Sequence, residues 1–283
     1  MDITKIDAYS PAEMEERIEA VGAVKAKLDF LSMFSLAILA GAFISFGAVF
    51  FTFVAHDSSL GFVPSQLLGG LCFSLGLILV IVAGAELFTG NNLIVMSFVS
   101  RKITLWQLLR NWTIVYLGNF AGALTMVMWI YLSMHWTAHQ NLVGAKALAI
   151  ASAKVSLPFV VAFTRGILCN ALVCLAVWLC ASGRSVTDKI LSVIFPITAF
   201  VALGFEHCIA NMYFIPMGLI LKGEPSILEA AGIARSSADA LSNLTVAGFL
   251  YNNLLPVTLG NIIGGSVMVG LIYWSVYHRV RSK

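Results

Sequence analysis

Charged side chains are scarce in this chain. Only 11% of its 283 residues are Asp, Glu, Lys or Arg, whereas a soluble domain carries roughly 25%, and this scarcity excludes an ordinary soluble globular protein. The formal net charge is +3, and Lys and Arg form neither a block nor a stripe interleaved with aromatics, which argues against a nucleic-acid partner. With 59% hydrophobic residues, the expected partner is the lipid bilayer.

Motifs for covalent or metal chemistry are also lacking. Neither the Gly-x-Ser-x-Gly of serine hydrolases nor the His-Glu-x-x-His of metalloproteases occurs, so we expect a protein that is not an enzyme. Five cysteines lie within apolar segments without the paired spacing of a metal site, and we interpret them as packing residues: Cys72, Cys169, Cys174, Cys180 and Cys208.

Six apolar runs are long enough to cross a hydrocarbon core of roughly 30 Å. They cover approximately residues 30–54, 66–98, 110–134, 158–182, 190–221 and 245–277. Six crossings place both termini on one side, and the segments on that side hold twelve Lys and Arg residues against four opposite. The positive-inside rule therefore predicts cytoplasmic termini. We expect one transmembrane domain over 30–277, an N-terminal segment over 1–29 and a cytoplasmic tail over 278–283.

The N-terminal segment lacks the basic and apolar regions of a signal peptide. Ser10, Pro11 and Glu13 match a helix N-cap, a first-turn proline and a capping box. Apolar residues then follow at near-helical spacing: Met14, Ile18, Val21 and Leu28. This pattern predicts an amphipathic helix on the membrane surface, either as an anchor or as a gate that responds to pH.

Two patterns occur twice in the same order. Gly84-x-Glu86-x4-Asn91 reappears as Gly204-x-Glu206-x4-Asn211, 120 residues later. Asn111-x5-Leu-Gly-Asn-x2-Gly in the third run reappears from Asn253 in the sixth. The halves, about 30–134 and 158–277, each contain three crossings and must have opposite topology, which is an inverted repeat. The repeat rests on two of the three pairs of runs, because we assign no such echo to the first and fourth.

The repeated Gly-x-Glu segments place polar residues inside otherwise apolar runs. Non-helical backbone at membrane depth is tolerated where it is buried in protein or lines a cavity, and paired interruptions of this kind indicate a transport site near the midplane. We therefore expect the second and fifth helices to be broken there. Glu86 and Glu206 are interpreted as residues that hold the loops, and His207, an intramembrane histidine, is the first candidate for function.

At this point three strings carry a resemblance to a known family. They are GAELFT at 84–89, GFEHCIANMYFIP at 204–216 and PVTLGNIIGG at 256–265. With these strings, nearly the whole chain resembles the formate/nitrite transporter family and its bacterial formate channels. The resemblance implies an aquaporin-like bundle that assembles as a homopentamer in the bacterial inner membrane. Each protomer would have its own pore for formate and related small monovalent anions, and no cofactor is implied.

The resemblance also implies roles for individual residues. The pore threonine and histidine of the family correspond to Thr89 and His207. Its supporting lysine and asparagines correspond to Lys154, Asn170 and Asn211. Its apolar constrictions correspond to Phe73, Leu77, Leu87, Phe88 and Phe200. This chain has Glu86 where an aspartate is also found, and Arg165 is an intramembrane cation that some relatives lack; it would either attract anions or pair with a loop carboxylate.

A bare anion at the membrane midplane has a desolvation cost of several kcal/mol. We hypothesise that Thr89 and His207 bind the carboxylate and that a proton shared from His207 lets a weak acid pass as a neutral molecule. The main alternative is a nitrite or hydrosulfide channel of the same family. Alternatives of other classes are an intramembrane enzyme and a sensor or scaffold without transport, and the paired broken helices disfavour the latter.

Overall fold

The protein is all-α, as predicted. The computed structural model describes residues 8–57, 59, 61–233 and 241–281, and within these ranges it contains helices and no strand. Five helical segments are long and apolar enough to cross a membrane: α2 (Phe30–Ala55), α3 (Phe62–Ala83), α6 (Leu105–Leu132), α8 (Phe159–Ser182) and the continuous segment Gly248–His278.

That last segment changes its helical winding along its length. It consists of η6 (Gly248–Leu254), α12 (Leu255–Ile262), η7 (Ile263–Leu271) and α13 (Ile272–Arg281), of which η6 and η7 are π-helical. The remaining apolar run is divided between α9 (Val186–Ala202) and α10 (Cys208–Leu221), which are individually too short to span. The count of six crossings therefore stays a prediction.

Both repeated polar segments interrupt helices. In the first half, α3 ends at Ala83 and the chain resumes with α4 (Phe88–Asn91), η3 (Asn92–Ile94) and α5 (Val95–Val99). In the second half, residues 203–207 separate α9 from α10. Gly84 and Gly204 end the preceding helices at φ angles of 83° and 69°, a left-handed conformation that glycine adopts without steric cost. The glycine of each repeated motif is thus the residue that turns the chain out of the helix.

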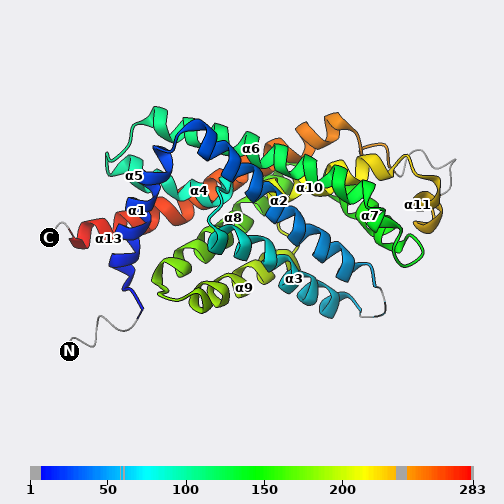
Figure 1. Cartoon of the computed structure of the whole chain (residues 1–283), viewed down its shortest axis with the longest axis horizontal. Helices are drawn as coiled ribbons and strands as arrows, with labels where there is room; N and C mark the ends of the chain where they lie inside the picture. The colour runs from blue at the N-terminus through cyan, green and yellow to red at the C-terminus, as the bar shows by residue number, and fades with distance from the viewer. Residues whose placement is uncertain (1–7, 58, 60, 234–240, 282–283) are drawn as a thin grey trace.

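The first and last described helices, α1 (Pro11–Ala26) and α13, lie at the same end of the molecule, beside α5 (Figure 1). The opposite end contains η4 (His135–Thr137), α7 (Leu142–Val155) and α11 (Pro225–Ala230). The loops after α5 and after α8, whose cations entered the orientation argument, are at the end with α1 and α13. Three of the counted cations, Lys5, Arg235 and Lys283, lie outside the described residues.

Helix α1 begins as predicted, with Ser10 and Glu13 forming a complete capping box. Its apolar face, however, packs on the protein: Met14 and Ile18 are buried, and α1 contacts η3, α5, α8 and α13. Glu19 on the same face is fully buried and forms an ion pair of 2.7 Å with Lys102. Val21, expected on the apolar face, is 53% exposed. The helix is therefore part of the bundle rather than only a surface segment.

The structure extends the repeat to the first and fourth runs. The backbone N–H of Glu86 donates to the carbonyl of Leu36 in α2 (3.2 Å), and that of Glu206 donates to the carbonyl of Arg165 in α8 (3.3 Å). Leu36 and Arg165 thus occupy equivalent positions. The two side chains differ, but their neighbours are alike at the same offset of 129 residues, since Phe-x3-Ile-Leu begins at Phe34 and again at Phe163. Sequence analysis missed this echo.

Candidate transport site

Two cavities flank the interrupted helices. The first has a volume of about 340 Å³, lies beside α1 and is lined by residues 84–87 of the first break. The second has a volume of about 280 Å³, lies beside α7 and is lined by residues 204–207 of the second break. Each break therefore forms part of the wall of one cavity, as expected for non-helical backbone at this depth.

An asparagine from a neighbouring helix holds each break. Asn119 of α6 accepts from the backbone N–H of Phe88 (2.9 Å) and donates to the carbonyls of Glu86 (2.9 Å) and Ala37 (2.7 Å). Asn261 of α12 makes the matching set: it accepts from Cys208 (2.9 Å) and donates to the carbonyls of Glu206 (3.0 Å) and Gly166 (2.7 Å). Both asparagines are fully buried, and they satisfy backbone groups that the broken helix leaves unpaired.

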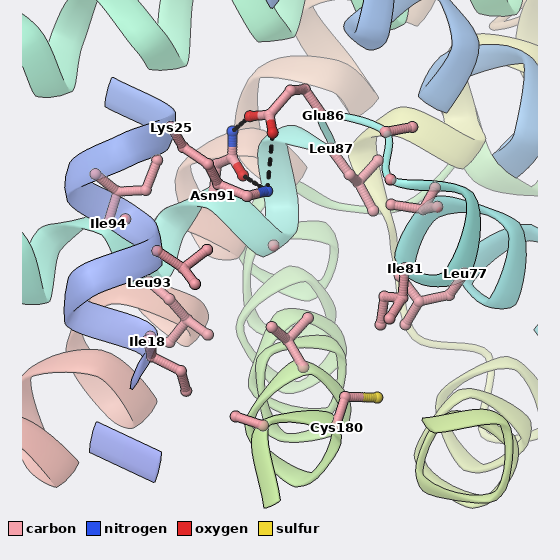
Figure 2. A pocket seen from close by; sticks show the side chains of 18 of the residues that line it. Ile18, Lys25, Leu77, Ile81, Glu86, Leu87, Asn91, Leu93, Ile94 and Cys180 are labelled. Atoms are coloured by element: carbon pink, nitrogen blue, oxygen red, sulfur yellow. Dashed lines mark hydrogen bonds and ion pairs between the residues drawn. The ribbon is translucent and has the colours of Figure 1, made fainter. Parts of the chain in front are cut away.

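Glu86 holds its loop through side chains rather than by capping backbone. Its carboxylate pairs with Lys25 of α1 at 3.0 Å and accepts from Asn91 at 2.7 Å. Lys25 also donates to the Oδ1 of Asn91 (3.0 Å), and Asn91 donates to Asn111 (3.0 Å). Figure 2 shows Lys25, Glu86 and Asn91 joined in this way at one side of the first cavity. The buried carboxylate is thus compensated by a cation and an amide, as burial of a charge requires.

The same cluster is built a second time around Glu206. Its carboxylate pairs with Lys154 of α7 at 2.9 Å and accepts from Asn211 (2.7 Å) and Asn253 (3.1 Å). Asn253 also donates to the carbonyl of Lys154 (2.9 Å), as Asn111 does to that of Lys25 (3.3 Å). Lys25 is therefore the counterpart of Lys154, and α1 is the counterpart of α7. Sequence analysis missed Lys25, Asn111 and Asn253 as site residues; the repeated asparagines were the available signal.

Thr89 and His207 meet between the two halves. The hydroxyl oxygen of Thr89 lies 2.9 Å from Nε2 of His207, and both residues are buried. The backbone N–H of Ala210 donates to Nδ1 of His207 (3.1 Å). Since Nδ1 accepts, the hydrogen-bond network assigns the ring hydrogen to Nε2, which then donates to Thr89. The histidine is held ready to donate a hydrogen bond at the position where the halves join.

Buried apolar side chains accompany this contact. Phe73 and Phe200 face each other edge to face at 5.6 Å between ring centroids, and Phe200 stacks on His207 at 5.9 Å. Both phenylalanines line the second cavity, whereas Leu77 and Leu87 line the first. All four are buried to 3% exposure or less. They are therefore placed where they would narrow a path between the cavities.

Phe88 is arranged differently from the other predicted constriction residues. Its ring packs edge to face on Tyr116 (4.9 Å) and near Trp112 (6.1 Å). It lines neither of the two cavities beside the breaks. We interpret Phe88 as a packing residue that anchors α4 to α6.

Asn170 forms hydrogen bonds where the two halves meet, and it lines neither of the two cavities. Its amide nitrogen lies within hydrogen-bond distance of the carbonyls of Thr89 (3.2 Å) and Asn261 (2.7 Å) and of the side chain of Asn92 (2.8 Å). It therefore ties the first break to the asparagine that holds the second.

The arrangement defines a class of protein. Apolar helices, two pseudo-equivalent breaks held by buried asparagines, and a cavity on each side of a polar contact are the features of a membrane transport protein built as an inverted repeat.

Comparison with known proteins identifies the family. The family model of formate/nitrite transporters matches residues 12–275. The formate channel FocA of Escherichia coli strain K12 is 45% identical over 276 residues, which cover 96% of both chains. FocA of Haemophilus influenzae is 42% identical, with 93% of both chains covered. A solved structure described as a pentameric formate channel with formate bound matches with a TM-score of 0.81 at 42% identity, covering 88% of this chain and 98% of that one. The chain belongs to the formate/nitrite transporter family.

Proposed function

We propose that this protein is a formate channel of a bacterial inner membrane, and that the anion crosses between the two cavities at Thr89 and His207. The observation that carries this proposal is the 2.9 Å contact between the Thr89 hydroxyl and His207 Nε2. His207 lines the second cavity together with Phe73 and Phe200, and Leu77 and Leu87 line the first. The relatives named as formate channels support formate as the substrate.

The two lysines supply positive charge on the two sides of this centre. Lys25 and Lys154 are each held beside a cavity by the glutamate of the neighbouring break. A paired lysine attracts an anion less than a free one does, but its ammonium still offers donors at short range. An anion that passes a cavity then meets the Thr89 hydroxyl and the His207 Nε2 hydrogen, which replace part of the water it loses.

Proton coupling would require His207 to be protonated on both ring nitrogens before it gives a proton to formate. A neutral imidazole that gave its Nε2 proton to a carboxylate would become an imidazolate, so only an imidazolium transfers a proton to formate. Protonation of Nδ1 removes the bond that it accepts from Ala210. We therefore propose that hydrogen bonding through Nε2 is the resting function and that proton transfer requires the start of α10 to move. A pH-independent, electrogenic formate current at the wild-type level in His207→Phe would contradict a protonation step.

We also propose an oligomeric state and an orientation in the membrane for the channel. The pentameric state of the solved relative supports a homopentamer with one pore in each protomer. The excess of Lys and Arg at the end with α1 and α13 supports cytoplasmic termini, with the first cavity facing the cytoplasm. We propose transport alone, without an enzymatic activity.

Stopped-flow uptake by vesicles that contain the purified protein tests this proposal. Formate uptake well above that of protein-free vesicles is expected, and competition with nitrite and hydrosulfide ranks the three anions. Transport of nitrite or hydrosulfide without formate would move the chain to another branch of the family. Absence of flux for all three anions would favour a sensor or scaffold.

A further inference from the structure

The second cavity contains two basic side chains whose charges are compensated differently. Lys154 and Arg165 both line it. The ammonium of Lys154 is paired with Glu206 at 2.9 Å. Among the residues that the structure describes, the guanidinium of Arg165 has neither a carboxylate at ion-pair distance nor a side-chain hydrogen bond. The net positive charge of this cavity therefore comes from Arg165.

Packing does not explain a cation at this position. The structural task of residue 165 is performed by its backbone, whose carbonyl accepts from Glu206 at the second break (3.3 Å). In the other half, Leu36 performs the same task for Glu86 (3.2 Å). Because an apolar side chain is compatible with the equivalent position, the charge of Arg165 calls for a separate reason.

The surroundings favour an anionic ligand for this side chain. Arg165 is half-buried, and aromatic rings form much of the cavity wall: Phe51, Phe73, Phe200, Phe205 and Phe214. A partly desolvated guanidinium without a counter-ion gains strongly from an anion, and its planar set of donors matches the two oxygens of a carboxylate. The cavity, at about 280 Å³, has ample room for a small carboxylate.

We propose that Arg165 makes the second cavity an anion-binding subsite, which holds a small carboxylate beside His207 before it crosses or after it has crossed. This subsite deepens the proposed formate channel and rests on it. Leu36 stands at the equivalent place beside the first break, so no counterpart of the Arg165 guanidinium exists there. The cations of the first cavity other than Lys25 are Arg17 on α1 and Lys189 on α9, and they are not equivalent to Arg165.

The test is the concentration dependence of formate uptake in vesicles containing purified full-length protein. Arg165→Leu copies the residue at the equivalent position and is therefore expected to fold. Loss of one charge near the anion should raise the half-saturating formate concentration roughly three- to tenfold, as a Coulomb interaction at about 6 Å in a medium between protein and water indicates. Chloride competition should weaken in parallel. Arg165→Lys should stay within about twofold of wild type, because the charge is retained.

Arg184→Gln is the matched control, because Arg184 stacks on Tyr9 at 3.8 Å and lines neither cavity; it should leave the half-saturating concentration unchanged. Wild-type uptake with an unchanged value in Arg165→Leu overturns the subsite alone. Equal impairment in Arg165→Leu and Arg165→Lys also overturns it, since packing would then be the cause. Absence of formate uptake by the wild type overturns the proposed function itself.

Discussion

The hydroxyl of Thr89 and Nε2 of His207 lie 2.9 Å apart although 118 residues separate them. They do not stand at equivalent points: at the offset of 120 residues the counterpart of His207 is Leu87, and that of Thr89 is Ile209. The symmetric scaffold of the repeat therefore presents an asymmetric pair of polar groups at its centre. One of them, His207, is fixed as a donor by the backbone N–H of Ala210.

Replacing Thr89 should slow transport without unfolding the protein. Thr89→Val keeps the shape but removes the oxygen that faces His207. A hydrogen bond to a charged group contributes about 1.5 kcal/mol or more, so formate uptake should fall about tenfold. Thr89→Ser, which keeps the hydroxyl, should retain most of the rate. Uptake by Thr89→Val equal to that of Thr89→Ser would show that the hydroxyl does not contact the anion.

Asn119 and Asn261, which hold the two breaks, should contribute similar amounts to the free energy of unfolding. Asn119→Ala and Asn261→Ala each remove a buried amide that makes three hydrogen bonds to backbone. Each variant should lose about 3 kcal/mol of stability, since buried groups are left unsatisfied. Thermal unfolding in detergent measures this. Thr125→Ala is the control, because the exposed Thr125 bonds only within its own helix. A loss confined to one asparagine would contradict the structural equivalence.

The ion pair between Lys25 and Glu86 offers a test of the role found for α1. Lys25→Met leaves the nearly buried carboxylate of Glu86 without its cation and should destabilise the protein by about 3 kcal/mol. Adding Glu86→Gln should recover part of this loss, because the amide needs no counter-charge. A double-mutant cycle on unfolding gives the coupling energy. Strictly additive losses would mean that the two residues do not interact in solution.

The start of α1 should respond to acid. The backbone N–H and hydroxyl of Ser10 hold the pKa of Glu13 below its ordinary value, and the nearby Arg17 and Arg184 act in the same direction. Stabilisation of the cap is therefore complete above the unfolded-state pKa of about 4.3 and is lost as the pH falls through the lower folded-state pKa.

Glu13→Gln separates this effect from other titrations, because its amide oxygen accepts the same bonds without a charge. Amide protection of α1 should be higher in the wild type than in Glu13→Gln at pH 7, and the two should converge at strongly acidic pH. Hydrogen exchange measures the difference. If the difference in amide protection between the wild type and Glu13→Gln did not change with pH, the carboxylate charge would not contribute to the stability of the cap.

Much of the fold could be predicted because its signals are local. Apolar runs of spanning length indicated the helices, and the repeated Gly-x-Glu segments marked the breaks, where Gly84 and Gly204 have positive φ angles. His207 stood out because a titratable ring inside an apolar run requires a reason. Ser10 and Glu13 predicted the start of α1 correctly.

The relations between distant residues could not be predicted in the same way. Lys25 and Lys154 are equivalent through contacts with Glu86 and Glu206. Lys-x2-Leu-x-Phe begins at both lysines, but so short a pattern does not show that each lysine pairs with a glutamate about 50 to 60 residues away. Leu36 and Arg165 have similar neighbours, but the hydrogen bonds that their carbonyls accept could come to any residue and leave no mark in the sequence. Phe88 was predicted as a constriction residue from its place in the motif, and its ring contacts with Trp112 and Tyr116 could not be predicted because those residues lie on another helix.

The central claim is that formate passes at Thr89 and His207. It is tested most directly by stopped-flow formate uptake in vesicles containing wild-type protein, His207→Asn or the control His139→Asn, in which a histidine bonded to His56 on the surface is changed. We predict that His207→Asn slows uptake at least about tenfold, in line with the loss of a donor to an anion, while His139→Asn equals the wild type. Wild-type uptake by a folded His207→Asn protein would contradict the account.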